Sequence, residues 1–331
     1  MGPVEWDTGK RVWEARECFD DRFVLLYSDN LVPFPMEKML SLHQEHKLPL
    51  TLMVAPKLPG NIILDENGIL QNYDYKRSSD LGFVEIGYMI VEKQRTLTFF
   101  QNPNCNFSSI LKRMAAQQQI SAWIQHDAYH SISDKERWMK AEEYLKPKKI
   151  LLIDRDGVIN LKAPKGEYIT SCEDFKWIPE TREGMKQLAK DGFRFIVISN
   201  QAGIARGMID PDALTRINKM MKDELLKDGI EILDIYVCPH HWEDNCLCRK
   251  PNPGMLLQAS KEHLLRLDRT VFIGDDPRDV ETAWNAGCKA ILLGDSSDIT
   301  SVLLKKYPHY ATSYLTASLE FIRKHYNPGL Q

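Results

Sequence analysis

Three short polar motifs in the second half of the chain carry carboxylates, a hydroxyl and backbone N–H groups that could attack an electrophile, move a proton, or bind an anion or a metal ion. In the first, Asp154 and Asp156 stand close enough in sequence that one carboxylate could attack an electrophile while the other moves a proton. In the second, the Ser199 hydroxyl precedes a run of backbone N–H groups that suits an anion. In the third, Asp275 offers the oxygen ligands that Mg²⁺ prefers. Taken singly, each motif could equally be a solvated turn or a helix N-cap.

Between the second and third motifs lies a concentrated group of soft metal ligands. Cys238, His240, Cys246 and Cys248 could close a tetrahedral Cys₃His site, with His241 as the alternative imidazole. Four protein ligands leave no open position, so a zinc ion there would be structural. Unliganded surface thiols are the other interpretation, although soft ligands so concentrated usually hold a metal. The chain has seven cysteines, an odd number that argues against a disulfide framework and favours a reducing, cytoplasmic compartment.

The elements that must position these motifs alternate regularly. Apolar runs predict strands over 150–153, 193–198, 231–237, 270–273 and 290–293, and helices are predicted around 181–191, 211–227, 254–266 and 279–286. This alternation indicates an α/β fold with a doubly wound parallel sheet, in which a site forms at the carboxyl ends of the strands. Each of the three motifs directly follows a predicted strand, so we expect them at one edge of the sheet.

The front part of the chain is a less regular, mixed α/β segment. A helix predicted over 134–145 ends before Pro147, so we expect two domains, 1–147 and 148–331. The front domain is predicted to contain strands over 23–27, 50–54 and 82–91, a hairpin over 61–70 that turns at Asn67-Gly68, and helices over 36–46 and 108–117.

Composition excludes several classes of protein. The 331 residues include 43 basic and 46 acidic side chains, a net charge of −3 that argues against a nucleic-acid binder. No apolar run approaches the roughly 18 residues of a membrane helix, and the start of the chain does not resemble a signal peptide. The expected partner is therefore a small molecule, with no nucleic acid and no membrane.

The three motifs occur in order along the chain, with Arg249-Lys250-Pro251 between the second and the third. Together they resemble the four motifs of the haloacid dehalogenase-like phosphohydrolases, over about residues 149–295. The resemblance implies that Asp154 is a nucleophile that forms an aspartyl-phosphate, and that Asp156 acts as general acid and then as general base. It implies that Ser199 and Lys250 hold the phosphoryl oxygens. It also implies an Mg²⁺ site made by Asp154, the backbone carbonyl of Asp156, and Asp275. Because Asp156 must first donate a proton, we expect burial to raise its pKa.

The ligand-rich loop narrows the resemblance to the histidinol-phosphatase-related group. It looks most like the D-glycero-D-manno-heptose 1,7-bisphosphate 7-phosphatases, on the residues 154–160, 200–207, 238–241 and 246–255. In that group the positions of Cys238, His240, Cys246 and Cys248 correspond to the zinc ligands.

Four residues in these segments are candidates for binding substrate: Asn200, Gln201, Arg206 and Arg249. The two arginines are our candidates for a second, non-reacting phosphate, because a guanidinium can bind phosphate through two hydrogen bonds. Either arginine could instead form an ordinary surface ion pair.

Residues 9–146 resemble the later portion of sugar-1-phosphate nucleotidyltransferases of the heptose- and mannose-phosphate guanylyltransferase type. Asp29 matches the metal-binding Asp at a strand end, and 82–89 resembles the sugar-binding strand region. Ser131 stands where a second metal-binding Asp is expected, and nothing before Asp29 supplies the Gly-rich nucleotide loop. We therefore expect a partial, catalytically silent domain whose free sheet edge favours a homo-oligomer.

The leading hypothesis is a cytoplasmic Mg²⁺-dependent phosphatase with a structural zinc. It would remove the 7-phosphate of a heptose 1,7-bisphosphate on the route to nucleotide-activated heptose for surface glycans. The alternatives are a histidinol-phosphate phosphatase, a sugar-1-phosphate guanylyltransferase with an accessory phosphatase domain, and a non-catalytic assembly module.

Overall fold

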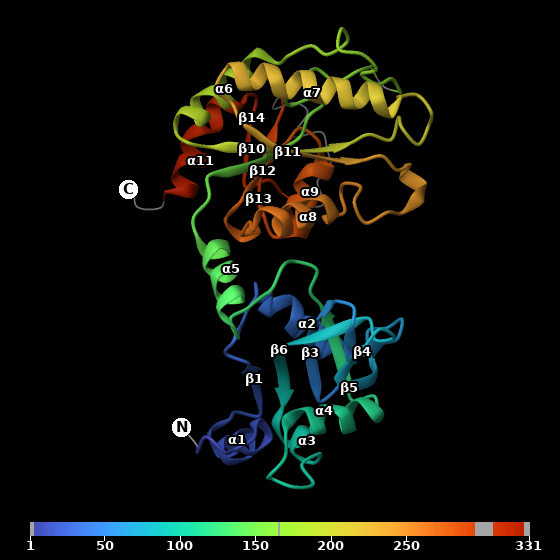
Figure 1. The fold of residues 1–331 in the computed structure, drawn as a ribbon, viewed down its shortest axis with the longest axis vertical. Coiled ribbons are helices and arrows are strands. Elements are labelled where there is room, and N and C mark those ends of the chain that lie inside the picture. The colour runs from blue at the N-terminus through green and yellow to red at the C-terminus, as the bar shows by residue number, and fades with distance from the viewer. Residues whose placement is uncertain (1–2, 165, 295–306, 328–331) are drawn as a thin grey trace. The chain divides into compact units, whose positions relative to one another are not determined.

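The computed structural model describes residues 3–164, 166–294 and 307–327. It separates into two compact units, Met1–Ala141 and Glu142–Gln331, each with its own sheet (Figure 1). The first unit ends inside helix α5 (Lys135–Leu145), and the sheet of the second unit begins at Ile150. The boundary after Pro147, just beyond the end of this helix, remains our proposal.

A parallel sheet forms the centre of the second unit. Within the described residues it has six strands in the order β11-β10-β9-β12-β13-β14, and all neighbouring pairs are parallel. The strands are β9 (Ile150–Ile153), β10 (Arg194–Asn200), β11 (Ile232–Cys238), β12 (Val271–Gly274), β13 (Lys289–Leu293) and β14 (Tyr310–Thr312). All four residues of β9 are buried, as expected of a strand covered on both faces.

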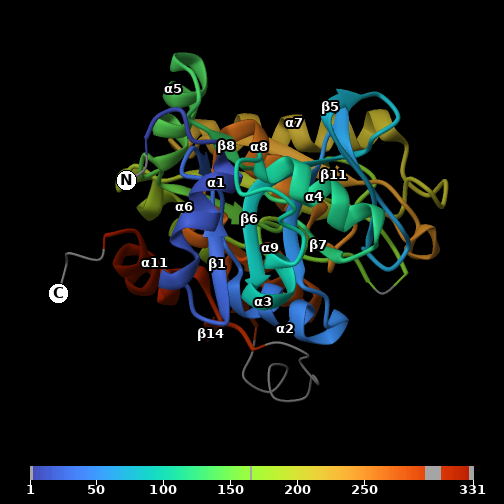
Figure 2. The same cartoon turned by 90° about the horizontal axis from the view of Figure 1, so that it is seen from below.

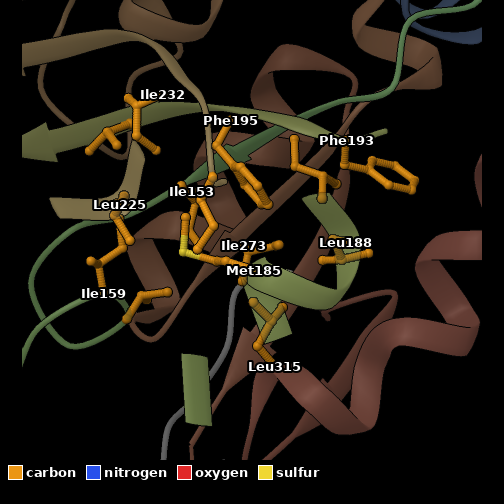
Figure 3. Packing of buried hydrophobic residues seen from close by; sticks show 14 of the residues in the cluster. Ile153, Ile159, Met185, Leu188, Phe193, Phe195, Leu225, Ile232, Ile273 and Leu315 are labelled. Carbon is orange, nitrogen blue, oxygen red and sulfur yellow. The ribbon is translucent and has the colours of Figure 1, made fainter. Parts of the chain in front are cut away.

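Helices cover both faces of this sheet. In Figure 1, α6 (Pro179–Lys190) and α7 (Pro211–Lys227) lie on one side, and α8 (Gly254–His263) and α9 (Pro277–Ala286) on the other. Figure 3 shows how Met185 and Leu188 of α6 and Leu225 of α7 pack against Ile153 and Phe195 of the sheet. Burial of each such side chain stabilises the fold by about 1.5–3 kcal/mol, before the opposing loss of conformational entropy.

The predicted doubly wound sheet is confirmed, with its predicted strands and helices placed to within a few residues. Two elements near the C-terminus were not predicted, namely β14 and α11 (Leu319–Tyr326). The three residues of β14 are too short for a periodic pattern. They become a strand because Ile291, Leu292 and Leu293 of β13 supply a parallel partner.

The first unit has the predicted mixed α/β organisation, and its sheet combines parallel and antiparallel pairs. Within the described residues its main path is β5-β4-β6-β3-β7, and β1 pairs with β6 beside that path. Figure 2 shows β1 next to β6. The strands are β1 (Arg22–Leu26), β3 (Leu50–Pro56), β4 (Gly60–Leu64), β5 (Leu70–Ser78), β6 (Phe83–Glu92) and β7 (Ile120–Ile124). The predicted hairpin joins β4 to β5, and Gly68 adopts the positive φ of +76° that its turn requires.

Helices pack against both faces of this sheet. The helices are α1 (Thr8–Ala15), α2 (Met36–His46), α3 (Lys93–Leu97) and α4 (Phe107–Ala116). Ile110 and Met114 of α4 belong to one buried apolar cluster, whereas Met39 of α2 belongs to a second. Among the described helices of both units, none is long and apolar enough to cross a membrane.

A short ribbon brings the two predicted nucleotidyltransferase-like positions together. β2 (Asn30–Leu31) pairs with β8 (His130–Ser131), so that Asn30 lies opposite Ser131, and the Ile132 N–H donates to the Asp29 carbonyl at 2.8 Å. Asp29 is exposed. The groups of potential metal ligands found among the described residues both lie in the second unit and do not include Asp29.

Candidate active site

The polar motifs of the second unit meet at the carboxyl ends of its central strands. Ile153 of β9 lies level with Val197 of β10 and with Ile273 of β12. The residue after β9, Asp154, continues this ladder by donating its N–H to the Ile273 carbonyl at 2.8 Å. Strand register thus carries Asp154 and Asp275 to the same edge, as the sequence predicted.

Three carboxylates form the centre of the site. Asp154, Asp275 and Asp279 each place an oxygen within 4.8 Å of the other two. Asp154 and Asp279 are buried, and Asp275 is half-buried. Asp279 lies on α9, where its Oδ2 accepts the backbone N–H groups of Asp275 and Asp276 at 3.2 and 3.1 Å. Asp279 was not predicted as a site residue.

The donor set fits a hard divalent cation. The buried Oδ1 of Asp275 has no hydrogen-bond partner. A Cβ on Gly157, which has a φ of +94°, would collide with Asp275 Oδ2, so only glycine leaves this oxygen accessible. Carboxylate oxygens grouped in this way are the ligands that Mg²⁺ prefers.

The pKa shifts of these carboxylates also favour a cation at this place. Burial raises the pKa of Asp154 to about 7, even though Lys250 opposes the shift. Burial likewise raises the pKa of Asp275 to about 6, although Lys162 lies 2.6 Å from its Oδ2. The negative charge of Asp279 adds to both shifts. A cation among the three would favour the charged forms and offset their repulsion.

Lys250 is buried against the same carboxylates. Its Nζ lies 2.8 Å from Asp154 Oδ2 and 2.7 Å from Asp279 Oδ1. Burial alone would lower the pKa of Lys250, but these two carboxylates raise it above its ordinary value, so the side chain stays protonated. Asn200 fixes the Lys250 main chain by accepting its N–H at 3.1 Å and donating to its carbonyl at 3.2 Å.

A second polar network surrounds Asp156. Its carboxylate accepts hydrogen bonds from Arg155 Nη2 at 2.9 Å, from Asn160 Nδ2 at 2.9 Å and from Gln201 Nε2 at 2.6 Å. The same Gln201 nitrogen lies 2.8 Å from the Oγ of the buried Ser199. The network therefore brings together the predicted residues Asp156, Ser199 and Gln201.

The expectation of a raised pKa for Asp156 is wrong. Burial acts in that direction, but the charge of Arg155 and the hydrogen bonds from Asn160, Arg155 and Gln201 outweigh it and hold the pKa below its usual value. Sequence reasoning missed Arg155, whose side chain is fully buried and donates from Nη1 to Asn218 at 3.1 Å. The sequence shows only that Arg155 stands between two aspartates; the burial of its side chain, which makes a charged partner necessary, is visible only in the structure.

The soft ligands also converge. Cys238, His240, Cys246 and Cys248 gather with Sγ–Sγ distances of 3.4–3.6 Å. His240 Nδ1 lies 3.1 Å from Cys248 Sγ and 3.6 Å from Cys238 Sγ. Zinc–sulfur bonds of about 2.3 Å in a tetrahedron imply sulfur separations of about 3.8 Å, so this donor set fits zinc. The alternative ligand His241 instead accepts the Glu243 N–H through its Nδ1.

The two predicted arginines lie on or beside this loop. Arg249 is half-buried, and its Nη1 lies 3.5 Å from the His240 carbonyl. Arg206 is exposed, and its guanidinium lies against the rings of Tyr168 and Trp242.

Several known proteins are similar to this chain. The HAD-hydrolase-like family model matches residues 247–319. D-glycero-alpha-D-manno-heptose-1,7-bisphosphate 7-phosphatase of Photorhabdus laumondii is 33% identical over 160 residues, which cover 46% of this chain and 86% of that protein. D-glycero-beta-D-manno-heptose-1,7-bisphosphate 7-phosphatase of Helicobacter pylori is 38% identical over 146 residues, which cover 44% of this chain and 82% of that protein.

Solved structures are also similar to this chain, with TM-scores below 0.5. D,D-heptose 1,7-bisphosphate phosphatase from B. bronchiseptica, complexed with magnesium and phosphate, is 28% identical with a TM-score of 0.49, covering 53% of this chain and 98% of that chain. HddC from Yersinia pseudotuberculosis is 16% identical with a TM-score of 0.37, covering 44% of this chain and 65% of that chain. The curated relatives, which this chain matches over more than four-fifths of their length, are what decide the family. The chain therefore belongs to the haloacid dehalogenase-like phosphatases of the D-glycero-D-manno-heptose 1,7-bisphosphate 7-phosphatase family.

Proposed function

We propose that the second unit removes the 7-phosphate of D-glycero-D-manno-heptose 1,7-bisphosphate, in an Mg²⁺-dependent reaction through an aspartyl-phosphate on Asp154. The observation that carries this proposal is the buried group formed by Asp154, Asp275, Asp279 and Lys250. This group offers a nucleophile, a donor set for a cation and a fixed positive charge within one small region. The named relatives supply the choice of sugar.

Asp154 and Asp275, together with the backbone carbonyl of Asp156, would hold the Mg²⁺ ion. When bound, this ion supplies positive charge that offsets the repulsion between a carboxylate and a phosphate dianion. The unpartnered Oδ1 of Asp275 and the space left by Gly157 support this assignment. Asp279 holds Lys250 and the start of α9 in place beside these ligands.

In the first half of the reaction, a carboxylate oxygen of Asp154 attacks the 7-phosphorus, and the bond from phosphorus to the sugar oxygen breaks. Lys250 and the Ser199 hydroxyl hold the phosphoryl oxygens in line. Ser199 accepts from Gln201 and can therefore direct its own O–H toward an anion. Asp156 gives its proton to the departing sugar oxygen. The negative charge of the bound phosphate favours the protonated form of Asp156, because a nearby negative charge raises a carboxyl pKa.

In the second half, Asp156 takes a proton from water as the water oxygen attacks phosphorus. The phosphorus–oxygen bond to Asp154 breaks, and inorganic phosphate leaves. The hydrogen bonds from Arg155, Asn160 and Gln201 stabilise the charged form of Asp156, which is the form a general base needs.

The remaining predicted residues have supporting roles in this proposal. Cys238, His240, Cys246 and Cys248 would hold a structural zinc, which keeps the loop before Lys250 folded. Arg206 and Arg249 would receive the 1-phosphate, which is not cleaved. Asn200 orients Lys250 and Gln201 orients Asp156, in addition to any contact with substrate.

We also propose that the first unit is catalytically silent and that it mediates self-association in a cytoplasmic enzyme. The observation that supports a silent first unit is that exposed Asp29 lies beside Ser131 rather than beside a second carboxylate at that position.

Phosphate release from heptose 1,7-bisphosphate and from histidinol phosphate, each with and without Mg²⁺, tests the main proposal. We expect Mg²⁺-dependent turnover of the heptose ester, with phosphorus NMR showing that the 1-phosphate is retained. Asp154→Asn should lower turnover at least about a thousandfold while circular dichroism remains unchanged. Preference for histidinol phosphate, or normal turnover by Asp154→Asn, would contradict the proposal.

A further inference from the structure

Arg206 is held by aromatic side chains from two other segments of the second unit. Its guanidinium carbon lies over the Trp242 ring, 5.4 Å from the ring centroid, and over the Tyr168 ring at 5.7 Å. Its Nη1 also donates to the Tyr168 hydroxyl at 3.2 Å. Because Arg206 is exposed, nothing in the packing of the core requires this arrangement.

The backbone around Arg206 fixes how these three segments meet. Ala205 donates its N–H to the Pro239 carbonyl at 3.2 Å, and Gln201 donates its N–H to the Cys238 carbonyl at 2.8 Å. A Cβ on Gly203 would come within 2.9 Å of the Tyr168 ring, so this position must stay small for the ring to lie there. The loop of Arg206 is thus tied to the loop of the soft metal ligands.

The Trp242 ring also packs against the ring of His241, the residue before it. The His241 ring centroid lies 3.7 Å from that of Trp242. His241 caps the short 3₁₀-helix η2 (Trp242–Asp244), and Asp244 accepts the His241 N–H in return at 2.8 Å. The Trp242 ring is therefore ordered before any ligand arrives, although about half of it is exposed.

This arrangement lowers the entropic cost of using an arginine to bind an anion. A free arginine loses much rotamer freedom when a ligand orders it. Rings beside the guanidinium face restrict that freedom in advance, and they leave in-plane N–H groups available for a bidentate contact with phosphate.

We propose that Tyr168 and Trp242 are positioning residues that orient Arg206 toward the phosphate that is not cleaved, and that they set the preference for a bisphosphorylated sugar over a monophosphorylated one. This inference rests on the proposed function. It adds that specificity depends on two aromatic residues that take no part in the chemistry.

The test compares heptose 1,7-bisphosphate with heptose 7-phosphate, which share the reacting phosphate. Trp242→Ala should raise the KM for the bisphosphate by about two- to fivefold, as expected for the loss of one exposed cation–π contact. It should leave kcat, and the KM for the monophosphate, unchanged. Trp242→Phe keeps a ring and should restore most of the preference. Tyr168→Phe, which removes only the hydroxyl contact, should have a smaller effect than Tyr168→Ala.

Two controls separate positioning from general damage. Leu247→Ala changes another exposed apolar side chain of the same loop and should alter neither KM. In an Arg206→Ala background, Trp242→Ala should cause no further change in the ratio of the two KM values. Equal effects of Trp242→Ala on both substrates, or a full additional effect without Arg206, would overturn the inference while leaving the proposed function intact. A wild-type chain that hydrolyses p-nitrophenyl phosphate but neither heptose ester would overturn both.

Discussion

Asp279, which the sequence did not single out, offers a quantitative test of the charge balance at the centre of the site. The change is Asp279→Asn, which keeps the size of the side chain and an oxygen that can accept the N–H groups of Asp275 and Asp276. It removes the negative charge that lies 2.7 Å from Lys250 Nζ. The side chains of Asp279 and Lys250 are only 2% and 4% exposed, so solvent compensates little.

The expected loss follows from three contributions. Breaking a buried ion pair typically costs about 3–5 kcal/mol, but Lys250 keeps Asp154 at 2.8 Å and the Ile198 carbonyl at 3.3 Å, so we take about half. Weaker acceptance of two backbone N–H groups costs about 1 kcal/mol. Relief of repulsion with the carboxylates of Asp154 and Asp275 returns about 1 kcal/mol. In the absence of Mg²⁺, the second unit should therefore lose about 2 kcal/mol of unfolding free energy.

Hydrogen exchange followed by mass spectrometry can measure this loss in the Mg²⁺-free chain, using peptides from β12 and α9 of the second unit. The matched control is Asp276→Asn. This side chain is more exposed than that of Asp279 and pairs with Arg278, whose side chain is about half exposed, so we expect a loss of at most about 1 kcal/mol. If Asp279→Asn proved as stable as wild type or more stable, repulsion among the carboxylates would outweigh the pair with Lys250, and the description of Lys250 as stabilised by Asp279 would be wrong.

Two further predictions concern stability. Removing zinc with a chelator, or replacing Cys246 with Ser, should lower the Tm of the second unit by about 5 °C or more in calorimetry, because a structural site contributes folding energy. Cys172→Ser, outside the ligand group, is the control, and a folded, active sample without zinc would contradict the prediction. In the first unit, burial lowers the pKa of His43 below 6.5 despite its contact with Glu92 at 3.0 Å. The unfolded chain then binds more protons, so stability should fall as the pH drops below about 6.5. Urea titrations should show a weaker dependence in His43→Gln, and the same dependence in both proteins would refute this origin.

The sequence predicted those parts of the site that strand ends determine. Asp154 and Asp275 follow buried apolar runs, and parallel register then brings them together. The grouping of Cys238, Cys246 and Cys248 could be predicted because residues so close together in the sequence also lie close together in space.

The features of the site and the fold that the sequence did not predict depend on tertiary contacts. Asp279 lies one helical turn beyond Asp275, and only the packing of α9 shows that it faces Lys250. The direction of the pKa shift of Asp156 depends on Arg155 turning inward, which periodicity does not reveal. In the first unit, β7 has a mixed sequence and becomes a strand through its parallel pairing with β3.

The position of β9 in the middle of its sheet has a consequence for how such an enzyme can change over evolutionary time. β9 is bonded to β10 on one side and to β12 on the other, so Asp154 is attached to the most strongly constrained part of the unit. Tyr168, Arg206 and Trp242 lie instead on connecting loops, which tolerate insertion and replacement. Replacements in these loops can therefore change which sugar phosphate is bound without disturbing the strands that hold Asp154.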